Sequence, residues 1–318
     1  MKPMPLWKHA FAYVTLGLLC GWYQFILILY PTLIGLTIMG YHIAGAILLV
    51  FLILQFIPLK YEVWEDFMYC WIWGVWREYF DFQGDWSTLT EHMAVKKKAG
   101  ETPKYVFFEF PHGIFPMGQF LSASLIKDIT PGTMVSGTAA DIVFMFPVMR
   151  HIMAWISTNP AKRANITKIL NRGDHLAIIP GGIAEMYLMN PETEGIYMRK
   201  RQNTVKAAIQ EGANIIPTFF FGNTKLFDVV GKNGSSSWLS SISRKMRASI
   251  VLFYGRNYLP VPYRHPIRMI SGRVVEVTKK DFPSEEDINK VLDDVIASVR
   301  ELYEKRKPDW ETRPLVVS

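Results

Sequence analysis

One histidine stands directly after an apolar run, in the segment Phe107-Phe108-Glu109-Phe110-Pro111-His112-Gly113. Residues 105–110 have the composition of a buried strand, and Pro-His-Gly predicts a turn at its end. Ligands of α/β proteins bind at the carboxyl ends of strands, and imidazole has a pKa suited to general-base work near neutrality. We therefore expect His112 to act as a general base. The alternative is a plain turn in which this histidine does no chemistry.

A second apolar run, ending at Ile179, leads into Pro180-Gly181-Gly182-Ile183-Ala184-Glu185. Two adjacent glycines, Gly181 and Gly182, allow the backbone to come close to a ligand. A carboxylate just beyond them could orient an imidazole or accept a hydrogen bond from a substrate hydroxyl. The alternative for Glu185 is an acid in the first turn of a helix that only favours the helix dipole.

A basic segment, Arg199-Lys200-Arg201, precedes a helix expected over residues 202–211. Cations beside the free amides of a helix N-terminus suit a phosphate-rich ligand such as coenzyme A; the alternative is a solvated basic loop. The next predicted strand leads to Phe221-Gly222-Asn223. Three turns that carry His112, Glu185 and Asn223 at strand ends can form one pocket.

Other kinds of active site lack their residues. The chain has no Gly-x-Ser-x-Gly elbow, no His-Glu-x-x-His, no P-loop and no dinucleotide-binding fingerprint. We therefore expect neither a metal nor a bound cofactor. A base without a nucleophilic partner suits direct acyl transfer from a thioester to a hydroxyl, which needs the base, an oxyanion donor and a thioester site.

The predicted elements alternate between strands and helices, which indicates an α/β domain with a mostly parallel sheet. Strands are expected at residues 105–110, 133–136, 176–179, 214–220, 267–270 and 274–277. One helix is expected to begin at Asn159-Pro160 and to end near residue 171. The helix over 202–211 should stop at Gly212, and a capping box from Ser284 to Asp287 should open a C-terminal helix.

The N-terminal region indicates a membrane. From Ala10 to Leu59 the chain has no Asp, Glu, Lys or Arg, which is long enough for two membrane passes. We expect helices near residues 11–30 and 41–57, with a break at Pro31, Gly35 and Gly40. Positive residues on both flanks, Lys2 and Lys8 before and Lys60 after, place both ends in the cytosol. A signal peptide and a buried hairpin of a soluble protein are the alternatives.

An aromatic-rich stretch follows, with tryptophans interleaved with charged residues between Trp64 and Trp86. Such a pattern is typical of a segment at the membrane interface, although ordinary core packing is the alternative. The sequence thus divides into a membrane hairpin (residues 1–60), an interfacial segment (61–100) and an α/β domain (101–318).

The composition of the 318-residue chain is basic, with a net charge of +7. This charge favours anionic lipid headgroups, while the absence of zinc-finger spacing and of an RNA-recognition signature argues against nucleic acid. Two cysteines without metal-binding spacing, Cys20 and Cys70, are expected to be reduced and structural.

Taken in order, the motifs resemble those of the type 2 diacylglycerol acyltransferase family over nearly the whole chain. They include Trp76-Arg77-Glu78-Tyr79-Phe80, the Phe-Pro-His-Gly turn, Pro-Gly-Gly-x-x-Glu, Arg199-Lys200, Phe221-Gly222-Asn223 and Tyr254-Gly255-Arg256. The resemblance implies acyl-CoA as donor, triacylglycerol as product, and His112 as the catalytic histidine. It also implies endoplasmic-reticulum and lipid-droplet membranes, with the enzymatic domain in the cytosol.

Two positions depart from the family's patterns. Phe110 stands where animal and fungal members carry the first histidine of His-Pro-His-Gly, and Met117 stands where broader glycerolipid acyltransferases carry an aspartate. Glu185 is then the remaining partner for His112.

We therefore expect an acyl-CoA-dependent O-acyltransferase that esterifies diacylglycerol. Asn223 and the amides near Gly113 would contact substrate or oxyanion, and Arg199, Lys200 and Arg201 the coenzyme A phosphates. A monoacylglycerol or a long-chain alcohol is the alternative acceptor, a non-catalytic lipid-droplet hairpin protein is the alternative class, and an oligomer is possible.

Overall fold

A central sheet organises the computed structural model, which describes residues 1, 3–186, 189–230 and 252–318. Its strand order is β1-β10-β7-β2-β5-β3-β4. The bounds are β1 (Gln83–Asp85), β2 (Lys104–Phe110), β3 (Val135–Ala139), β4 (Asn159–Pro160), β5 (His175–Ile178), β7 (Ala213–Phe221) and β10 (Arg268–Ser271). Neighbours from β7 to β4 are parallel, whereas β10 runs antiparallel to β7 and β1 runs parallel to β10. The predicted mostly parallel α/β sheet is confirmed.

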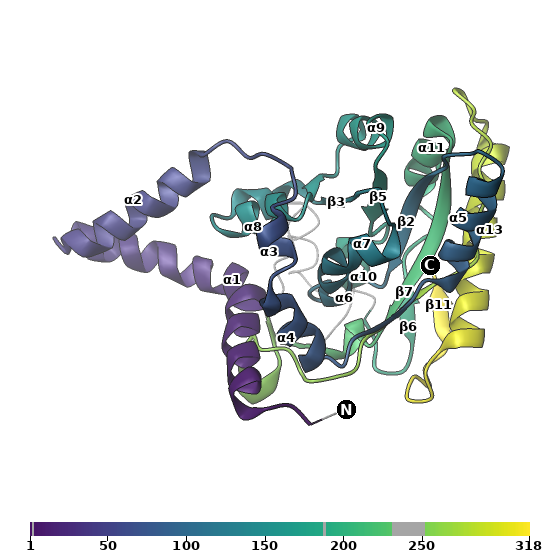
Figure 1. Ribbon diagram of the computed structural model, residues 1–318. Coiled ribbons are helices and arrows are strands. Elements are labelled where there is room, and N and C mark those ends of the chain that lie inside the picture. Colours follow the sequence, from purple (N-terminus) through teal and green to yellow (C-terminus); the bar gives the residue numbers. More distant parts are fainter. Residues whose placement is uncertain (2, 187–188, 231–251) are drawn as a thin grey trace.

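Helices cover both faces of this sheet (Figure 1). On one face lie α9 (Arg163–Asn171), α11 (Gln202–Glu211) and α13 (Glu285–Arg306); on the other lie α4 (Trp71–Tyr79), α6 (Met117–Ser122), α7 (Ile126–Ile129) and α8 (Met149–Trp155). Side chains along a strand alternate between faces. Accordingly, Phe107 of β2 packs on the face that α4, α6, α7 and α8 cover. Phe108 and Phe110 pack on the opposite face, with α11 and α13.

Two helix predictions hold and one is wrong. α11 has its expected bounds and ends at Gly212, whose φ is +64°. α13 begins with the expected capping box, in which Ser284 and Asp287 each accept the other's backbone N–H. The helix expected from Asn159 begins instead at Arg163. Asn159 and Pro160 form the edge strand β4 beside β3, a place where proline is tolerated because one side of the strand needs no donor.

The predicted strand at residues 274–277 is also wrong, because that stretch makes a single bridge, from Val275 to Ile215. The remaining elements are short. They are α3 (Glu65–Met68), α5 (Ser87–Lys98), α10 (Ile183–Met186), β6 (Glu194–Ile196) paired with β11 (Leu315–Val317), and β8 (Asp228–Val229) paired with β9 (Phe253–Tyr254). The 3₁₀ turns are η1 (Ala123–Leu125), η2 (Asp141–Met145), η3 (Asn223–Lys225) and η4 (Arg256–Tyr258).

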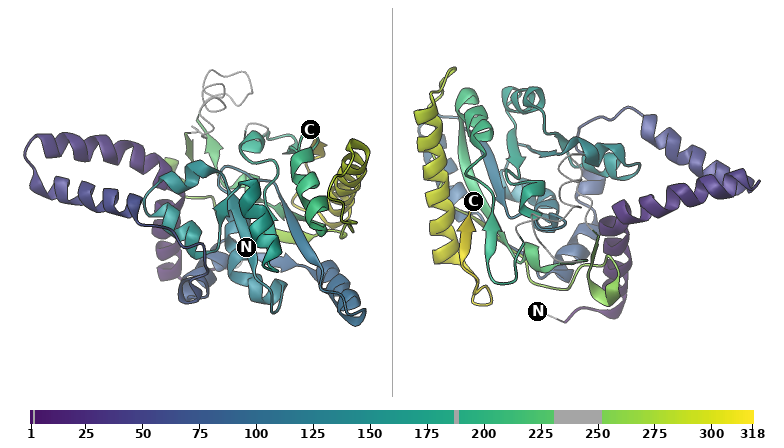
Figure 2. Two further views of the ribbon diagram at one scale, coloured as in Figure 1. Left: turned by 90° about the horizontal axis from the view of Figure 1, so that it is seen from above. Right: turned by 180° about the vertical axis from the view of Figure 1, so that it is seen from behind.

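The N-terminal region forms a helical hairpin of α1 (Leu6–Ile38) and α2 (His42–Phe56), which projects away from the rest of the molecule (Figures 1 and 2). The expected break at Pro31 is wrong, because α1 continues through Pro31 and Gly35 and the chain turns at Gly40, where φ is +91°. Lys2 lies outside the described residues.

The length of the hairpin does not fit two complete membrane passes. Among the described residues, α1 is the one helix long and apolar enough to span a membrane. With 15 residues, α2 is about 22 Å long, shorter than the hydrocarbon core of about 30 Å. The first part of α1 packs against the α/β domain and is therefore not free to lie in a membrane. Ala12, Leu16 and Cys20 are buried there, and Thr15 accepts a 2.9 Å hydrogen bond from the Trp76 indole.

The aromatic-rich segment is divided between core and surface. Trp73, Trp76 and Tyr79 of α4 are buried, so ordinary core packing accounts for them. Trp64 and Trp71 are 47% and 59% exposed. Both cysteines, Cys20 and Cys70, are free.

Candidate active site

Three turns meet at one edge of the sheet. Strand β2 lies between β5 and β7 and is parallel to both, with Phe108 paired to Ile178 and Phe110 to Phe219. The carboxyl ends of parallel strands point the same way, so the segments that follow them lie together. The turns after these strands carry His112, Glu185 and Asn223, as the sequence predicts.

The ring of His112 is held in one tautomer. Its Nδ1 lies 2.8 Å from the carbonyl oxygen of Gly113, and because a carbonyl only accepts, Nδ1 carries the proton. Nε2 therefore has a free lone pair, and it has no partner within the described chain. Burial lowers the pKa of His112 below its usual value, although the bond to Gly113 acts in the opposite direction. The neutral ring is the form that can accept a proton.

Glu185 holds the backbone of the turn that carries His112. Its Oε2 accepts the N–H of His112 at 2.7 Å and its Oε1 accepts the N–H of Tyr197 at 2.9 Å. We expected Glu185 to orient the imidazole or a substrate hydroxyl; in the structure both of its oxygens accept from backbone N–H groups, one of them that of His112. Burial raises the pKa of Glu185 to about 8, against the opposing effect of these two donors and of Arg201.

The Pro-Gly-Gly turn makes room for the Glu185 carboxyl group. A Cβ on Gly181 would lie 1.9 Å from Oε1 of Glu185, and Gly182 has a φ of +52°. Gly181 thus leaves the space that the Glu185 side chain occupies, and Gly182 lines the cavity beside His112.

Asn223 joins the turn that carries His112 to the start of α6. Its Nδ2 donates to the carbonyl oxygens of Pro111 and His112 at 3.0 and 2.9 Å, and its Oδ1 accepts the N–H of Gly118 at 2.9 Å. The residue is 1% exposed. Its amide is therefore engaged with protein, and the geometry gives it a positioning role in place of the expected substrate contact. Gly113 completes the fit, with a φ of +64° and a hypothetical Cβ only 2.8 Å from the Asn223 carbonyl oxygen.

His112 lies in the wall of a cavity of about 820 Å³. Its lining is predominantly apolar and comes from α1, β2, β3, α8 and the turn after β5. From α1 the contributors are Cys20, Tyr23, Gln24 and Leu27. The cavity therefore extends from α1 of the hairpin to the turn that carries His112, and its volume is within the range of small-molecule sites.

The three cations of the basic segment, Arg199, Lys200 and Arg201, do not face the same surroundings. Arg201 lines the cavity, donates to the carbonyl oxygen of Gly181 at 2.7 Å and lies 4.8 Å from the ring centre of Tyr197. Arg199 and Lys200 are exposed and are not among the lining residues. Within the described chain, no group of three or more His, Cys, Asp or Glu side chains is placed to hold a metal ion.

Phe110 and Met117, the two residues that depart from the family's patterns, both lie in the protein core. Phe110 packs on the α11 and α13 side of the sheet, away from the cavity. Its neighbour Glu109 lines the cavity and is 7% exposed; burial raises its pKa to about 8. Met117 is fully buried. Sequence reasoning gave Glu109 no role, although the alternation from Phe107 places it on the cavity side.

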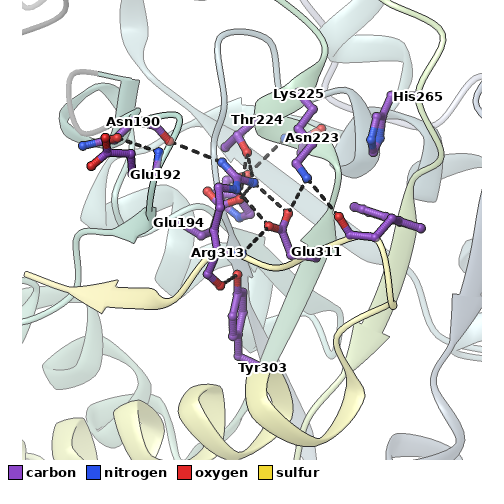
Figure 3. Close-up of polar contacts among 12 residues, drawn as sticks. Asn190, Glu192, Glu194, Asn223, Thr224, Lys225, His265, Tyr303, Glu311 and Arg313 are labelled. Atoms are coloured by element: carbon purple, nitrogen blue, oxygen red, sulfur yellow. Dashed lines mark hydrogen bonds and ion pairs between the residues drawn. The ribbon is translucent and has the colours of Figure 1, made fainter.

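A buried charge cluster around Arg313, which sequence reasoning missed entirely, includes Thr224 and Lys225, the two residues that follow Asn223 (Figure 3). Arg313 contacts Glu194 at 2.5 Å and Glu311 at 2.7 Å, and Lys225 contacts Glu311 at 3.2 Å. Thr224, which follows Asn223, donates to Glu194 at 2.7 Å. The cluster thus ties the C-terminal segment to η3.

Comparison with known proteins agrees with this geometry. A family model described as diacylglycerol acyltransferase matches residues 41–317. "Diacylglycerol O-acyltransferase 1" of Schizosaccharomyces pombe is 29% identical over 217 residues, covering 64% of this chain and 63% of that protein. "2-acylglycerol O-acyltransferase 1" of Bos taurus is 26% identical over 251 residues, covering 74% and 73%. "Diacylglycerol O-acyltransferase 2" of Homo sapiens is 26% identical over 267 residues, covering 77% and 67%.

The chain spans slightly less than two thirds of the fission-yeast relative, and no solved structure matches. The family model nevertheless covers all three turns, the strands beneath them and, within the hairpin, α2 but not α1. The resemblance indicated by the sequence motifs is confirmed, and the chain belongs to the diacylglycerol acyltransferase family.

Proposed function

We propose that the protein transfers an acyl group from acyl-CoA to the free hydroxyl of diacylglycerol, with His112 as general base. The observation that carries this proposal is the position of His112 Nε2, unpartnered within the described chain, in the wall of an apolar cavity that α1 also lines. A hydroxyl is a weak nucleophile, so a positioned base is what this reaction needs most.

The reaction requires no covalent enzyme intermediate. Nε2 of His112 takes the hydroxyl proton as the acceptor oxygen bonds to the thioester carbonyl carbon. The carbon–sulfur bond then breaks, and the departing sulfur takes the proton from the imidazolium, which yields an ester and free coenzyme A. The N–H groups of Ile114 and Phe115 are our candidates for the oxyanion, because both residues line the cavity and neither N–H has a hydrogen-bond partner in the described chain.

The donor's phosphates would lie outside the apolar cavity. Arg199 and Lys200 are exposed cations two residues and one residue before Arg201, which lines the cavity. A thioester near His112 could therefore extend past Arg201 to a nucleotide held by the exposed pair.

The acceptor would arrive from the membrane. The hairpin exposes large apolar side chains on α2: Ile43, Leu49 and Phe56 are 79%, 57% and 80% exposed. Exposed apolar surface of this kind is typical of a lipid-binding or protein-binding face, and we propose that lipid covers it. Because α2 is too short to cross a bilayer, we propose that the hairpin enters one leaflet and that both ends stay in the cytosol. The exposed Trp7 and Trp71, whose rings lie 6.5 Å apart, would sit at the headgroup level. Endoplasmic reticulum and lipid droplets are the membranes we propose.

The test uses purified protein in liposomes, with labelled acyl-CoA and one acceptor at a time. Diacylglycerol, 2-monoacylglycerol, a long-chain alcohol and a lysophospholipid form the panel. We expect triacylglycerol without added metal or nucleotide. Preference for 2-monoacylglycerol would move the protein toward the activity in the name of its bovine relative. Preference for the lysophospholipid, or no ester from any acceptor, would overturn the proposal, and the latter would favour a coat protein.

A further inference from the structure

Glu109 is a buried acid for which the proposed reaction has no use so far. It lies near the end of β2, three residues before His112, and it is 7% exposed. Its carboxyl group faces the cavity and has no hydrogen-bond or ion-pair partner within the described chain. A polar group buried in this way costs free energy unless something else in the cavity satisfies it.

The carboxyl group is a neutral donor rather than a charge. Burial is the cause that raises the pKa of Glu109 to about 8, and no cation of the described residues offsets the effect. At neutral pH the group therefore carries its proton and offers one O–H donor and one carbonyl acceptor. A neutral acid does not attract the phosphates of acyl-CoA, so a neutral polar group on a lipid is the better match.

The spacing along β2 fits such a lipid. Three residues of extended chain separate Glu109 from His112 by at most about 11 Å between Cα atoms, and both side chains line the same cavity. A glycerolipid acceptor has its free hydroxyl and an ester carbonyl on neighbouring parts of one glycerol. A long-chain alcohol has the hydroxyl alone.

We propose that Glu109 donates a hydrogen bond to an ester carbonyl of the glycerolipid acceptor while the acceptor's hydroxyl lies at His112. This inference rests on the proposed function. It assigns Glu109 to acceptor selection: the residue distinguishes a glycerolipid from a plain alcohol, and it does not take part in the proton transfer.

The test compares diacylglycerol with a dialkylglycerol of the same chain lengths, which keeps the hydroxyl but has ether links in place of ester carbonyls. The variants are Glu109→Met, which removes the donor, and Glu109→Gln, which retains an N–H donor. Glu286→Gln on the exposed first turn of α13 is the matched control. The measured quantity is the ratio of kcat/KM for ester over ether.

We expect the unchanged protein to prefer the ester by about 2- to 12-fold, the range for one hydrogen bond. Glu109→Met should lower the ester value to the ether value and leave the ether value unchanged. Glu109→Gln should keep most of the preference, and Glu286→Gln all of it. An equal loss on both lipids in Glu109→Met, or an unchanged ratio, would overturn the inference.

Two further measurements separate the outcomes. Glu109→Met should not lower Tm, because it removes a buried acid that has no partner within the described chain; a fall in Tm would indicate a structural role and overturn the inference. Binding of both lipids in detergent micelles without acyl-CoA tests Glu109 independently of turnover. If no acceptor is esterified, the proposed function fails, yet an ester-over-ether binding preference that Glu109→Met abolishes would support this inference, and equal binding would overturn it.

Discussion

Replacing Arg313 with methionine should destabilise the protein, because it leaves two buried acids without their main partner. Arg313 contacts Glu194 and Glu311 at 2.5 and 2.7 Å, and both acids are 2% exposed. After the change Lys225 is the cation that remains beside them, 3.2 Å from Glu311. Breaking a buried ion pair by removing one partner costs about 3–5 kcal/mol. For a chain of 318 residues this corresponds to a fall in Tm of about 4–7 °C.

The loss should depend on pH in a defined direction. Burial alone would raise the pKa of Glu311, but Arg313 and Lys225 bring it below its usual value. A depressed folded-state pKa contributes stability that is present above the unfolded value of 4.5 and is lost as pH falls through the folded value. The deficit of Arg313→Met should therefore be large at pH 7 and shrink below pH 4.5. Burial already raises the pKa of Glu194 to about 7, so without Arg313 this acid takes up a proton instead of staying charged.

The assay is thermal unfolding of both proteins in the same detergent from pH 4 to 8, with Glu194→Gln and Glu311→Gln added to Arg313→Met as a rescue. Neutralising the two acids should restore part of the lost Tm. Turnover should fall further than stability explains, since Thr224 and Asn223 connect the cluster to the catalytic turn. A Tm within one degree of the unchanged protein at pH 7, or a deficit that grows toward pH 4, would refute the reasoning.

Three further variants probe the catalytic turn and the donor site. Glu185→Gln leaves one acceptor oxygen for the two N–H groups of His112 and Tyr197. We therefore expect kcat to fall by about tenfold or more, while KM for acyl-CoA stays within a factor of two in steady-state assays. A smaller fall in kcat would mean that Glu185 only interacts favourably with the helix dipole. Asn223→Ala removes the partner of the His112 carbonyl oxygen and of the Gly118 N–H, whereas Pro111 keeps the hydrogen bond from Gln119. Tm and kcat should therefore fall together, by about 2 kcal/mol or more in unfolding free energy; full activity at normal Tm would contradict the positioning role of Asn223. Neutralising Arg199 and Lys200 should raise KM for acyl-CoA and flatten its salt dependence; lower kcat at constant KM would indicate a structural role.

The sequence predicts the sheet and the meeting of the three turns because the signals are local. Strands β2, β5 and β7 are apolar runs, and the turns after them are marked by proline and glycine. Parallel pairing then brings the turns together whatever their separation in the chain. The wrong helix start arises because a local signal is overruled by tertiary structure. Asn159-Pro160 has the local pattern of a helix start, but its place at the sheet edge beside β3 decides its conformation.

The partners of the site residues could not be predicted from spacing. Glu185 and Asn223 were expected at the site, yet whether a side chain faces a ligand or a backbone N–H depends on packing between segments far apart in sequence. The Arg313 cluster joins residues separated by 119 positions, and no local pattern marks it. Glu109 is the exception, since the alternation of β2 alone places it opposite Phe110.

The central claim is that His112 is the base for acyl transfer, and its most direct test is the rate of the chemical step in His112→Ala. We expect kcat to fall by about two to four orders of magnitude, with Tm and acyl-CoA binding unchanged. The acid side of the unchanged protein's kcat/KM profile should follow a pKa below the usual 6.5, because activity is lost as the ring takes up a proton, and this limb should be absent from the residual activity of the variant. Near-normal turnover in a folded His112→Ala protein, or an unchanged acid limb, would contradict the account.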